Sequence, residues 1–179
     1  NVELMVVGER ELATALLLPH DHDGSPLPVL LDPYGGPHAL RVTRSHNAFL
    51  TSQWFADQGF AVIVADGRGT PGRGHGDERS IRDDLVDGVL DDQVAALHQA
   101  AERHPEIDLE RVAIRGWSFG GFLAARYAEL HPGRVEKLVL LCPGFDRCSR
   151  WEALFGPAVM REWEAAGWRG FEVKKGDGL

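Results

Sequence analysis

The sequence predicts an α/β protein with a mostly parallel central sheet flanked by helices. Short apolar stretches, typical of strands buried on both faces of a sheet, lie at residues 29–31, 60–65, 111–114 and 137–142. Stretches with helix-forming composition or helical apolar spacing lie between them, at residues 49–58, 83–103 and 122–130. Strands that alternate with helices build parallel sheets, because each helix carries the chain back to the edge where the next strand starts.

The N-terminal segment is expected to add a hairpin to this sheet. Residues 2–7 and 12–18 have the composition of two strands, with a turn at residues 8–10. The short strand at 29–31 then ends at the turn-forming segment DPYGGP, residues 32–37.

The helices and the later elements have recognisable ends. The helix at 49–58 stops at Gly59, and Pro105 follows the long amphipathic helix at 83–103. A glycine-rich loop, residues 67–76, precedes that long helix. Beyond the strand at 137–142, residues 151–168 are expected to form one or two short helices.

Composition narrows the class of protein. The chain has 179 residues, of which 44% are hydrophobic and 26% charged, as in ordinary globular domains. Its formal net charge of −8 argues against nucleic acid or an anionic membrane as the main partner. There is no apolar run of about 20 residues and no signal segment. We therefore expect a cytoplasmic location. Cys142 and Cys148 are expected to be free thiols there, and a late disulfide between them is the alternative.

The most informative motif is Gly-x-Ser-x-Gly at residues 116–120, placed between a predicted strand and a predicted helix. This arrangement is typical of the nucleophile elbow of α/β-hydrolases, in which a strained serine presents its hydroxyl above the sheet. Ser118 is then the candidate nucleophile, and the backbone N–H of Phe119 the first oxyanion donor. The alternative is a serine that merely fits a strand–helix turn, and the buried strand and the doubled glycine favour the nucleophile.

A second oxyanion donor is expected from the loop after an earlier strand. Tyr34 lies there, directly before the glycine pair 35–36, and could donate its phenol hydroxyl. A tight turn with a half-buried tyrosine explains the same residues equally well.

Two weaker motifs are not assigned a site. Residues 67–72 match Gly-x-Gly-x-x-Gly after a strand, but Pro71 and the later glycines indicate an irregular loop and not a helix that opens on a phosphate. Residues 20–23, His-Asp-His-Asp, lack a further ligand cluster, which favours a solvated turn. No cofactor and no metal is expected.

Three segments together resemble the prolyl oligopeptidase family of serine peptidases: YGGPH at 34–38, DGRGTPGRG at 66–74 and RVAIRGWSFGG at 111–121. The resemblance runs from about residue 1 to about residue 125. It implies an α/β-hydrolase catalytic domain in which Ser118 is the nucleophile and the Tyr34 hydroxyl joins the Phe119 amide in the oxyanion hole. Residues 131–145 look more like a small esterase-type α/β-hydrolase.

The chain departs from the family pattern after the nucleophile. The triad of this fold runs Ser, then Asp or Glu, then His. The one histidine after Ser118 is His131, which a predicted helix would place nearly 20 Å away. Asp146 is a candidate acid, whereas Asp177 lies at the extreme end. The sequence does not predict the last two strands, which normally bring the acid and the base, and truncation at the C-terminus would explain this.

We therefore expect one α/β-hydrolase-type domain over residues 1–179 that acts as a serine-type peptidase through an acyl-enzyme on Ser118. Carboxylesterase activity is the alternative within the enzymes. A catalytically silent scaffold is the alternative outside them, because a base is missing. The expected partner is a peptide or ester substrate, and the oligomeric state is left open.

Overall fold

The computed structural model describes residues 2–34, 36, 38–45, 47–131, 140–141 and 161. The chain divides into two units, residues 1–144 and residues 145–179. The fold described here is that of the first unit. In the second unit only Arg161 belongs to the described residues, and it is helical.

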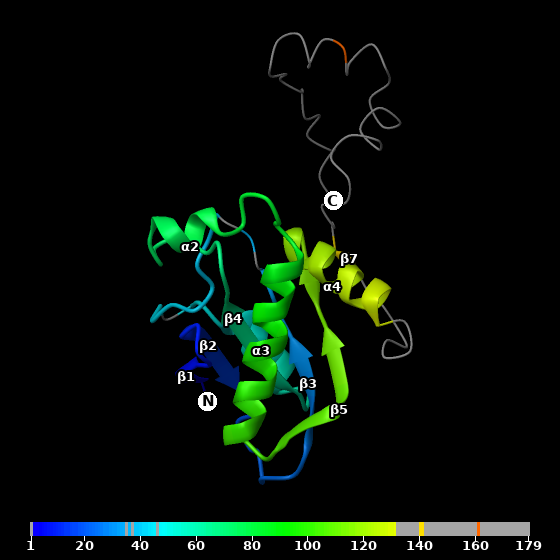
Figure 1. Ribbon diagram of the computed structural model, residues 1–179. Helices are drawn as coiled ribbons and strands as arrows, with labels where there is room; N and C mark the ends of the chain where they lie inside the picture. The colour runs from blue at the N-terminus through cyan, green and yellow to red at the C-terminus, as the bar shows by residue number, and fades with distance from the viewer. Residues whose placement is uncertain are drawn as a thin grey trace, which may run out of the picture. The chain divides into compact units, whose positions relative to one another are not determined.

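The first unit is built on a mixed sheet (Figure 1). Its strand order is β1-β2-β4-β3-β5. The strand β2 (Leu12–Leu17) pairs antiparallel with β1 (Val2–Val7) on one side and with β4 (Ala61–Asp66) on the other. The strands β3 (Leu27–Leu31), β4 and β5 (Ile107–Ile114) run parallel. After a break at Arg115 the chain continues as β6 (Gly116–Trp117), which pairs in parallel with β7 (Leu140–Leu141). This confirms the predicted α/β class, including the N-terminal hairpin.

Four helices accompany the sheet within the described residues: α1 (Leu50–Ala56), α2 (His75–Arg79), α3 (Asp87–Arg103) and α4 (Phe119–Leu130). The α3 helix lies across the face of the sheet that Figure 1 presents to the viewer. The opposite face packs against Phe49, at the start of α1, and Ala56, at its end. The sheet is therefore covered on both sides, as the apolar strands require.

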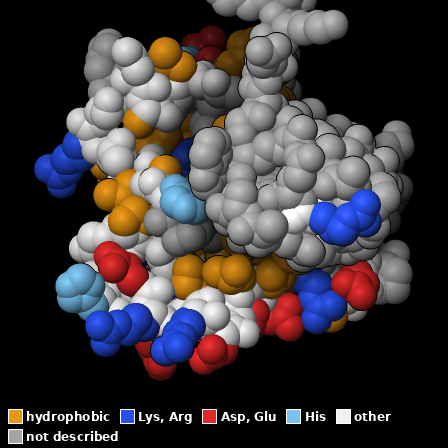
Figure 2. Space-filling view, turned by 90° about the horizontal axis from the view of Figure 1, so that it is seen from above, with side chains coloured by type: hydrophobic (Ala, Val, Ile, Leu, Met, Phe, Trp, Pro, Cys, Tyr) orange, Lys and Arg blue, Asp and Glu red, His pale blue; other side chains and the backbone are white. Residues whose placement is uncertain are grey.

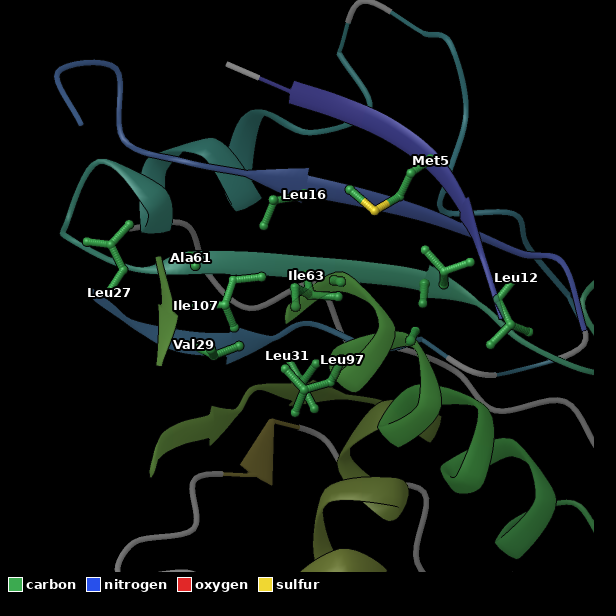
Figure 3. Close-up of a cluster of buried hydrophobic side chains, with 14 residues drawn as sticks. Met5, Leu12, Leu16, Leu27, Val29, Leu31, Ala61, Ile63, Leu97 and Ile107 are labelled. Atoms are coloured by element: carbon green, nitrogen blue, oxygen red, sulfur yellow. The ribbon is translucent and has the colours of Figure 1, made fainter. Parts of the chain in front are cut away.

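The alternation of side chains along β4 explains this two-sided core. Ala61, Ile63 and Ala65 contact the cluster that includes Leu97 of α3 (Figure 3). Val62 and Val64 point to the other face and pack in the cluster with Phe49. Successive side chains of a strand point to opposite faces, so one uniformly apolar strand supplies both clusters.

The largest differences from the sequence prediction are the starts of two elements and one additional helix. The α3 helix begins at Asp87 and not at Asp83, because the Asp84 carboxylate accepts hydrogen bonds from the backbone N–H groups of Val86, Asp87 and Gly88 and so sets the first turn. The β5 strand begins earlier than predicted, at Ile107. The short helix α2 occupies the end of the glycine-rich loop and was not predicted.

Several predictions fall wholly or partly outside the described residues. Of the strand expected at 137–142 only Leu140 and Leu141 are described, and they form β7. Both cysteines and Asp146 lie outside, as do the helices expected at 151–168 apart from Arg161. No helix among the described residues is long and apolar enough to cross a bilayer.

Candidate active site

Ser118 lies at the sharp bend between β6 and α4, where the sequence predicts the nucleophile. Its backbone has φ of 55° and ψ of −118°. Among the described non-glycine residues only Ser118 and Glu11 have positive φ. Such a conformation costs on the order of 1–3 kcal/mol and persists only where the surroundings impose it. The bend thus has the strained backbone that a nucleophile elbow requires.

The glycines around Ser118 are required by close backbone contacts. A Cβ atom at Gly116 would collide with the backbone of Gly120 and Gly121. A Cβ atom at Gly120 would collide with the carbonyl oxygen of Pro33. The Gly-x-Ser-x-Gly motif therefore has a steric explanation on both sides of the serine, and its second glycine also packs against the loop that carries Tyr34.

The N-terminus of α4 supplies the donors next to Ser118. The helix starts at Phe119, and neither a capping side chain nor an acidic residue occupies its first turn. The first N–H groups of a helix lack intrahelical acceptors and carry the positive end of its dipole. The Phe119 amide is accordingly one of these N–H groups, directly after Ser118.

Tyr34 lies three residues after the end of β3. In the sheet β3 is the neighbour of β5, the strand that precedes the elbow of Ser118. Its side chain is half-buried and folds over Gly36, where a Cβ atom would lie 3.1 Å from the Tyr34 hydroxyl oxygen. The Tyr34 Cα lies 3.7 Å from the position that a Gly120 Cβ would take. The structure thus brings the loop of Tyr34 against the first turn of α4. Gly35 and Pro37 lie outside the described residues.

A buried carboxylate lies where these two segments meet. The Asp32 side chain is 2% exposed. Its Oδ1 accepts a hydrogen bond from Arg115 Nη1 at 2.8 Å, and its Oδ2 accepts from Arg41 Nη2 at 2.9 Å and from Ser52 Oγ at 3.0 Å. The Arg115 guanidinium also lies over the Phe55 ring, 5.1 Å from its centroid. The buried carboxylate therefore has a hydrogen-bond partner at each oxygen, whereas the side chains of Arg115 and Arg41 are 25% and 28% exposed.

The glycine-rich loop is held by carboxylates. Its backbone amides donate to acidic side chains: Arg68 N to Asp92 at 2.6 Å, Gly69 N to Asp77 at 3.1 Å and Gly72 N to Glu78 at 3.2 Å. Figure 2, a view onto this end of the unit, shows Lys and Arg side chains beside Asp and Glu side chains along one rim. Amides that bind carboxylates are not open to a phosphate, so this part of the loop does not have the chemistry of a dinucleotide site.

The described histidines lie apart from Ser118 in the hydrogen-bond network. The Ser118 hydroxyl makes no hydrogen bond to any described residue. His131 is the residue after α4, and its ring contacts Tyr127, one helix length (roughly 20 Å) from the serine. His20 Nδ1 lies 2.8 Å from Asp57 Oδ1, and His104 Nδ1 lies 3.2 Å from Glu106 Oε1.

The other motif that the sequence singled out, residues 20–23, forms an exposed turn in which His20 binds Asp57. The hydrogen bonds from His20 and Gln53 lower the pKa of Asp57. Within the described part of the chain, no three His, Cys, Asp or Glu residues are grouped so that they could hold a metal ion.

Sequence reasoning missed the ion cluster around Asp32. One signal was present: Arg115 stands between the apolar residues 112–114 and the elbow, and a charge that is largely buried needs a partner. The partner could not be chosen from the sequence, because Asp32, Arg41 and Ser52 come from separate elements.

Comparison with known proteins identifies the family to which this chain belongs. A family model described as prolyl oligopeptidase family matches residues 46–165, about two thirds of the chain. The chain belongs to the prolyl oligopeptidase family. The matched region continues past residue 125, into the segment whose sequence looks more like an esterase, so membership of this family is not confined to the N-terminal resemblance.

Individual relatives of this prolyl oligopeptidase family chain agree. It is 38% identical to human dipeptidyl peptidase 8 over 115 residues, which cover 61% of this chain and 12% of that protein. The mouse dipeptidyl peptidase 8 is 37% identical, again over 115 residues, which cover 61% of this chain and 13% of the mouse protein. The chain thus spans about an eighth of the length of the curated relatives it matches.

Solved structures confirm the fold. The crystal structure of Porphyromonas gingivalis dipeptidyl peptidase 4 superposes with a TM-score of 0.59 and 30% sequence identity. The superposition covers 69% of this chain and 18% of that one. The described sheet and helices are accordingly those of an α/β-hydrolase, as the sequence predicts.

Proposed function

We propose that this protein is a serine peptidase in which Ser118 attacks a peptide carbonyl. The observation that carries the proposal is the backbone of Ser118, held at a positive φ immediately before the free N-terminus of α4. Membership of the prolyl oligopeptidase family and the names of the dipeptidyl peptidase relatives support a peptide substrate.

The proposed reaction has two stages. In the first, the Ser118 oxygen bonds to the carbonyl carbon while a base takes its proton, and the carbonyl oxygen becomes an oxyanion held by the Phe119 N–H and the Tyr34 hydroxyl. The carbon–nitrogen bond then breaks, and the leaving amine receives the proton. In the second stage, water attacks the acyl-enzyme and releases the acid product and the serine.

A fluorophosphonate probe tests the nucleophile directly. We expect the probe to label the protein once, on the peptide that contains Ser118, and Ser118→Ala to abolish labelling. The matched control is Ser25→Ala, at an exposed serine far along the chain, which should label like the unchanged protein. Labelling that survives in Ser118→Ala, or a failure of the unchanged protein to label, would refute the proposal.

Ester hydrolysis is the second candidate, supported by the esterase-like sequence of residues 131–145. A nitrophenyl ester and an aminoacyl anilide separate the two, since a peptidase turns over both and a carboxylesterase only the ester. A silent scaffold is the third candidate. It is favoured by the Ser118 hydroxyl, which has no hydrogen bond to a described residue, and unchanged biological activity in Ser118→Ala would support it.

A further inference from the structure

Arg115 connects the two segments that form the proposed oxyanion hole. It stands three residues before Ser118, and its guanidinium donates to Asp32, which stands two residues before Tyr34. Its backbone N–H also donates to the carbonyl oxygen of Leu31 at 2.8 Å. The main chain and the side chain of Arg115 therefore bind the same short segment, immediately before the loop of Tyr34.

The other oxygen of the Asp32 carboxylate closes that loop. Its partner Arg41 lies beyond Tyr34 in the chain, so the ion pair between Asp32 and Arg41 joins the two ends of residues 33–40. The backbone N–H of Arg41 is fixed in turn by both oxygens of Asp66, at 2.9 and 3.1 Å. Asp32 itself is held at its backbone, where its N–H donates to Ile63 at 2.9 Å.

These contacts make one continuous connection from the elbow to Tyr34. Pro33 adds a direct contact, because its carbonyl oxygen packs where a Gly120 Cβ would lie. Oxyanion stabilisation depends on donors about 2.7–3.1 Å from the developing charge, and a displacement of about 1 Å can cost 100-fold in rate. A connection that fixes the Tyr34 loop against α4 thus has a direct consequence for the rate.

We infer that Arg115 and Asp32 are positioning residues that hold the Tyr34 hydroxyl in register with the Phe119 amide. Neither side chain is assigned a contact with substrate or a proton to transfer. The inference rests on the proposed function, because it presupposes that Tyr34 and Phe119 share an oxyanion.

A double-mutant cycle tests the inference. The second-order rate of fluorophosphonate labelling would be measured for the unchanged protein, Arg115→Gln, Tyr34→Phe and the double variant. We expect Tyr34→Phe to slow labelling by about 100-fold and Arg115→Gln by about 10- to 100-fold. If Arg115 acts through Tyr34, then adding Arg115→Gln to Tyr34→Phe should change the rate by less than about twofold.

The matched control is Arg111→Gln. Arg111 lies four residues before Arg115, on β5, but its side chain is 54% exposed and binds Asp108. It should label at the rate of the unchanged protein. A second variant, Arg115→Lys, retains a positive charge for Asp32 and should recover part of the lost labelling rate. Urea unfolding curves of both Arg115 variants show whether a slow rate reflects a failure to fold.

The outcomes separate the two proposals. Steady-state hydrolysis of a nitrophenyl ester should show a lower kcat for Arg115→Gln with little change in KM, because positioning affects the oxyanion and not ground-state binding. If the labelling rate of the double variant falls by the product of the two single effects, Arg115 does not act through Tyr34 and the positioning role is overturned. Labelling of Ser118 in the unchanged protein would still support the proposed function. No labelling of Ser118 in the unchanged protein would overturn both.

Discussion

At the scale of single residues, the backbone conformation of Ser118 lowers the stability of the fold, and a catalytic role of the serine would explain why it is kept. A side chain at φ of 55° and ψ of −118° is unfavourable, whereas glycine reaches positive φ freely. We expect Ser118→Gly to be more stable than Ser118→Ala by about 1–3 kcal/mol, as measured by urea unfolding. Ser25→Gly, in a turn without positive φ, should bring no gain. Equal stability of Ser118→Gly and Ser118→Ala would contradict the strain.

The carboxyl group of a second residue, Asp66, leads to a prediction about how stability depends on pH. Burial raises the pKa of its carboxyl group above the ordinary value of 3.8, although the N–H groups of Arg41 and Val42 oppose this. As the pH rises from 3.8 through the folded-state pKa, the unfolded chain releases the proton first, so the contribution of Asp66 to stability falls.

We expect Asp66→Asn to gain stability relative to the unchanged protein across that pH interval, as urea unfolding at a series of pH values would measure. Asp108 gives the control of opposite sign, since the Arg111 side chain lowers the pKa of its carboxyl group. Asp108→Asn should lose relative stability as the pH rises. A difference curve for Asp66→Asn that is flat, or that falls, would show that burial does not dominate at this carboxyl group.

At the scale of elements, the start of α3 depends on one side chain. The Asp84 carboxylate accepts hydrogen bonds from the backbone nitrogens of Val86, Asp87 and Gly88, at 2.8, 3.0 and 3.2 Å. These bonds lower the pKa of its carboxyl group. Asp84→Ala should speed amide hydrogen exchange of Val86, Asp87 and Gly88 by about 2- to 10-fold. The neighbouring Asp83→Ala should leave those amides unchanged. Equal exchange in both variants would remove the capping role.

The elements also show what a sequence can predict. The apolar stretch at 60–65 and the motif at 116–120 determine their structures locally, through burial on both faces and through crowding between glycines, and both were predicted correctly. The start of α3 was misplaced because propensity does not show which of several aspartates will bind the backbone. The cluster of Asp32, Arg41 and Arg115 depends on long-range pairing across β3 and β5, which composition and spacing do not encode. Whether Tyr34 and Phe119 act on an oxyanion stays a prediction.

At the scale of the first unit, the N-terminal hairpin is joined to α3 by charge as well as by apolar packing. Arg10 lies at the turn between β1 and β2. Its Nη2 is 3.0 Å from Oδ1 of Asp77 on α2, and its Nε is 3.3 Å from Oδ1 of the buried Asp92 on α3. Arg10→Ala should lower the free energy of unfolding by about 1–2 kcal/mol, because Asp92 then loses one of its cationic partners.

The control for this prediction is Arg79→Ala. Arg79 is exposed on α2 and has no ion pair among the described residues, so its removal should change stability by less than about 0.5 kcal/mol. If the two variants unfold at the same urea concentration, the ion pairs of Arg10 do not stabilise the fold.

The strand order also has a consequence during synthesis. The hairpin of β1 and β2 is translated before its neighbour in the sheet, β4, so Leu16 and Leu17 are paired with β1 alone until residues 61–66 have left the ribosome. Pairing strands so distant in sequence is slow, because the intervening chain must first be ordered. During this interval the edge of β2 that later pairs with β4 is open to pairing with another chain, which is a route to aggregation.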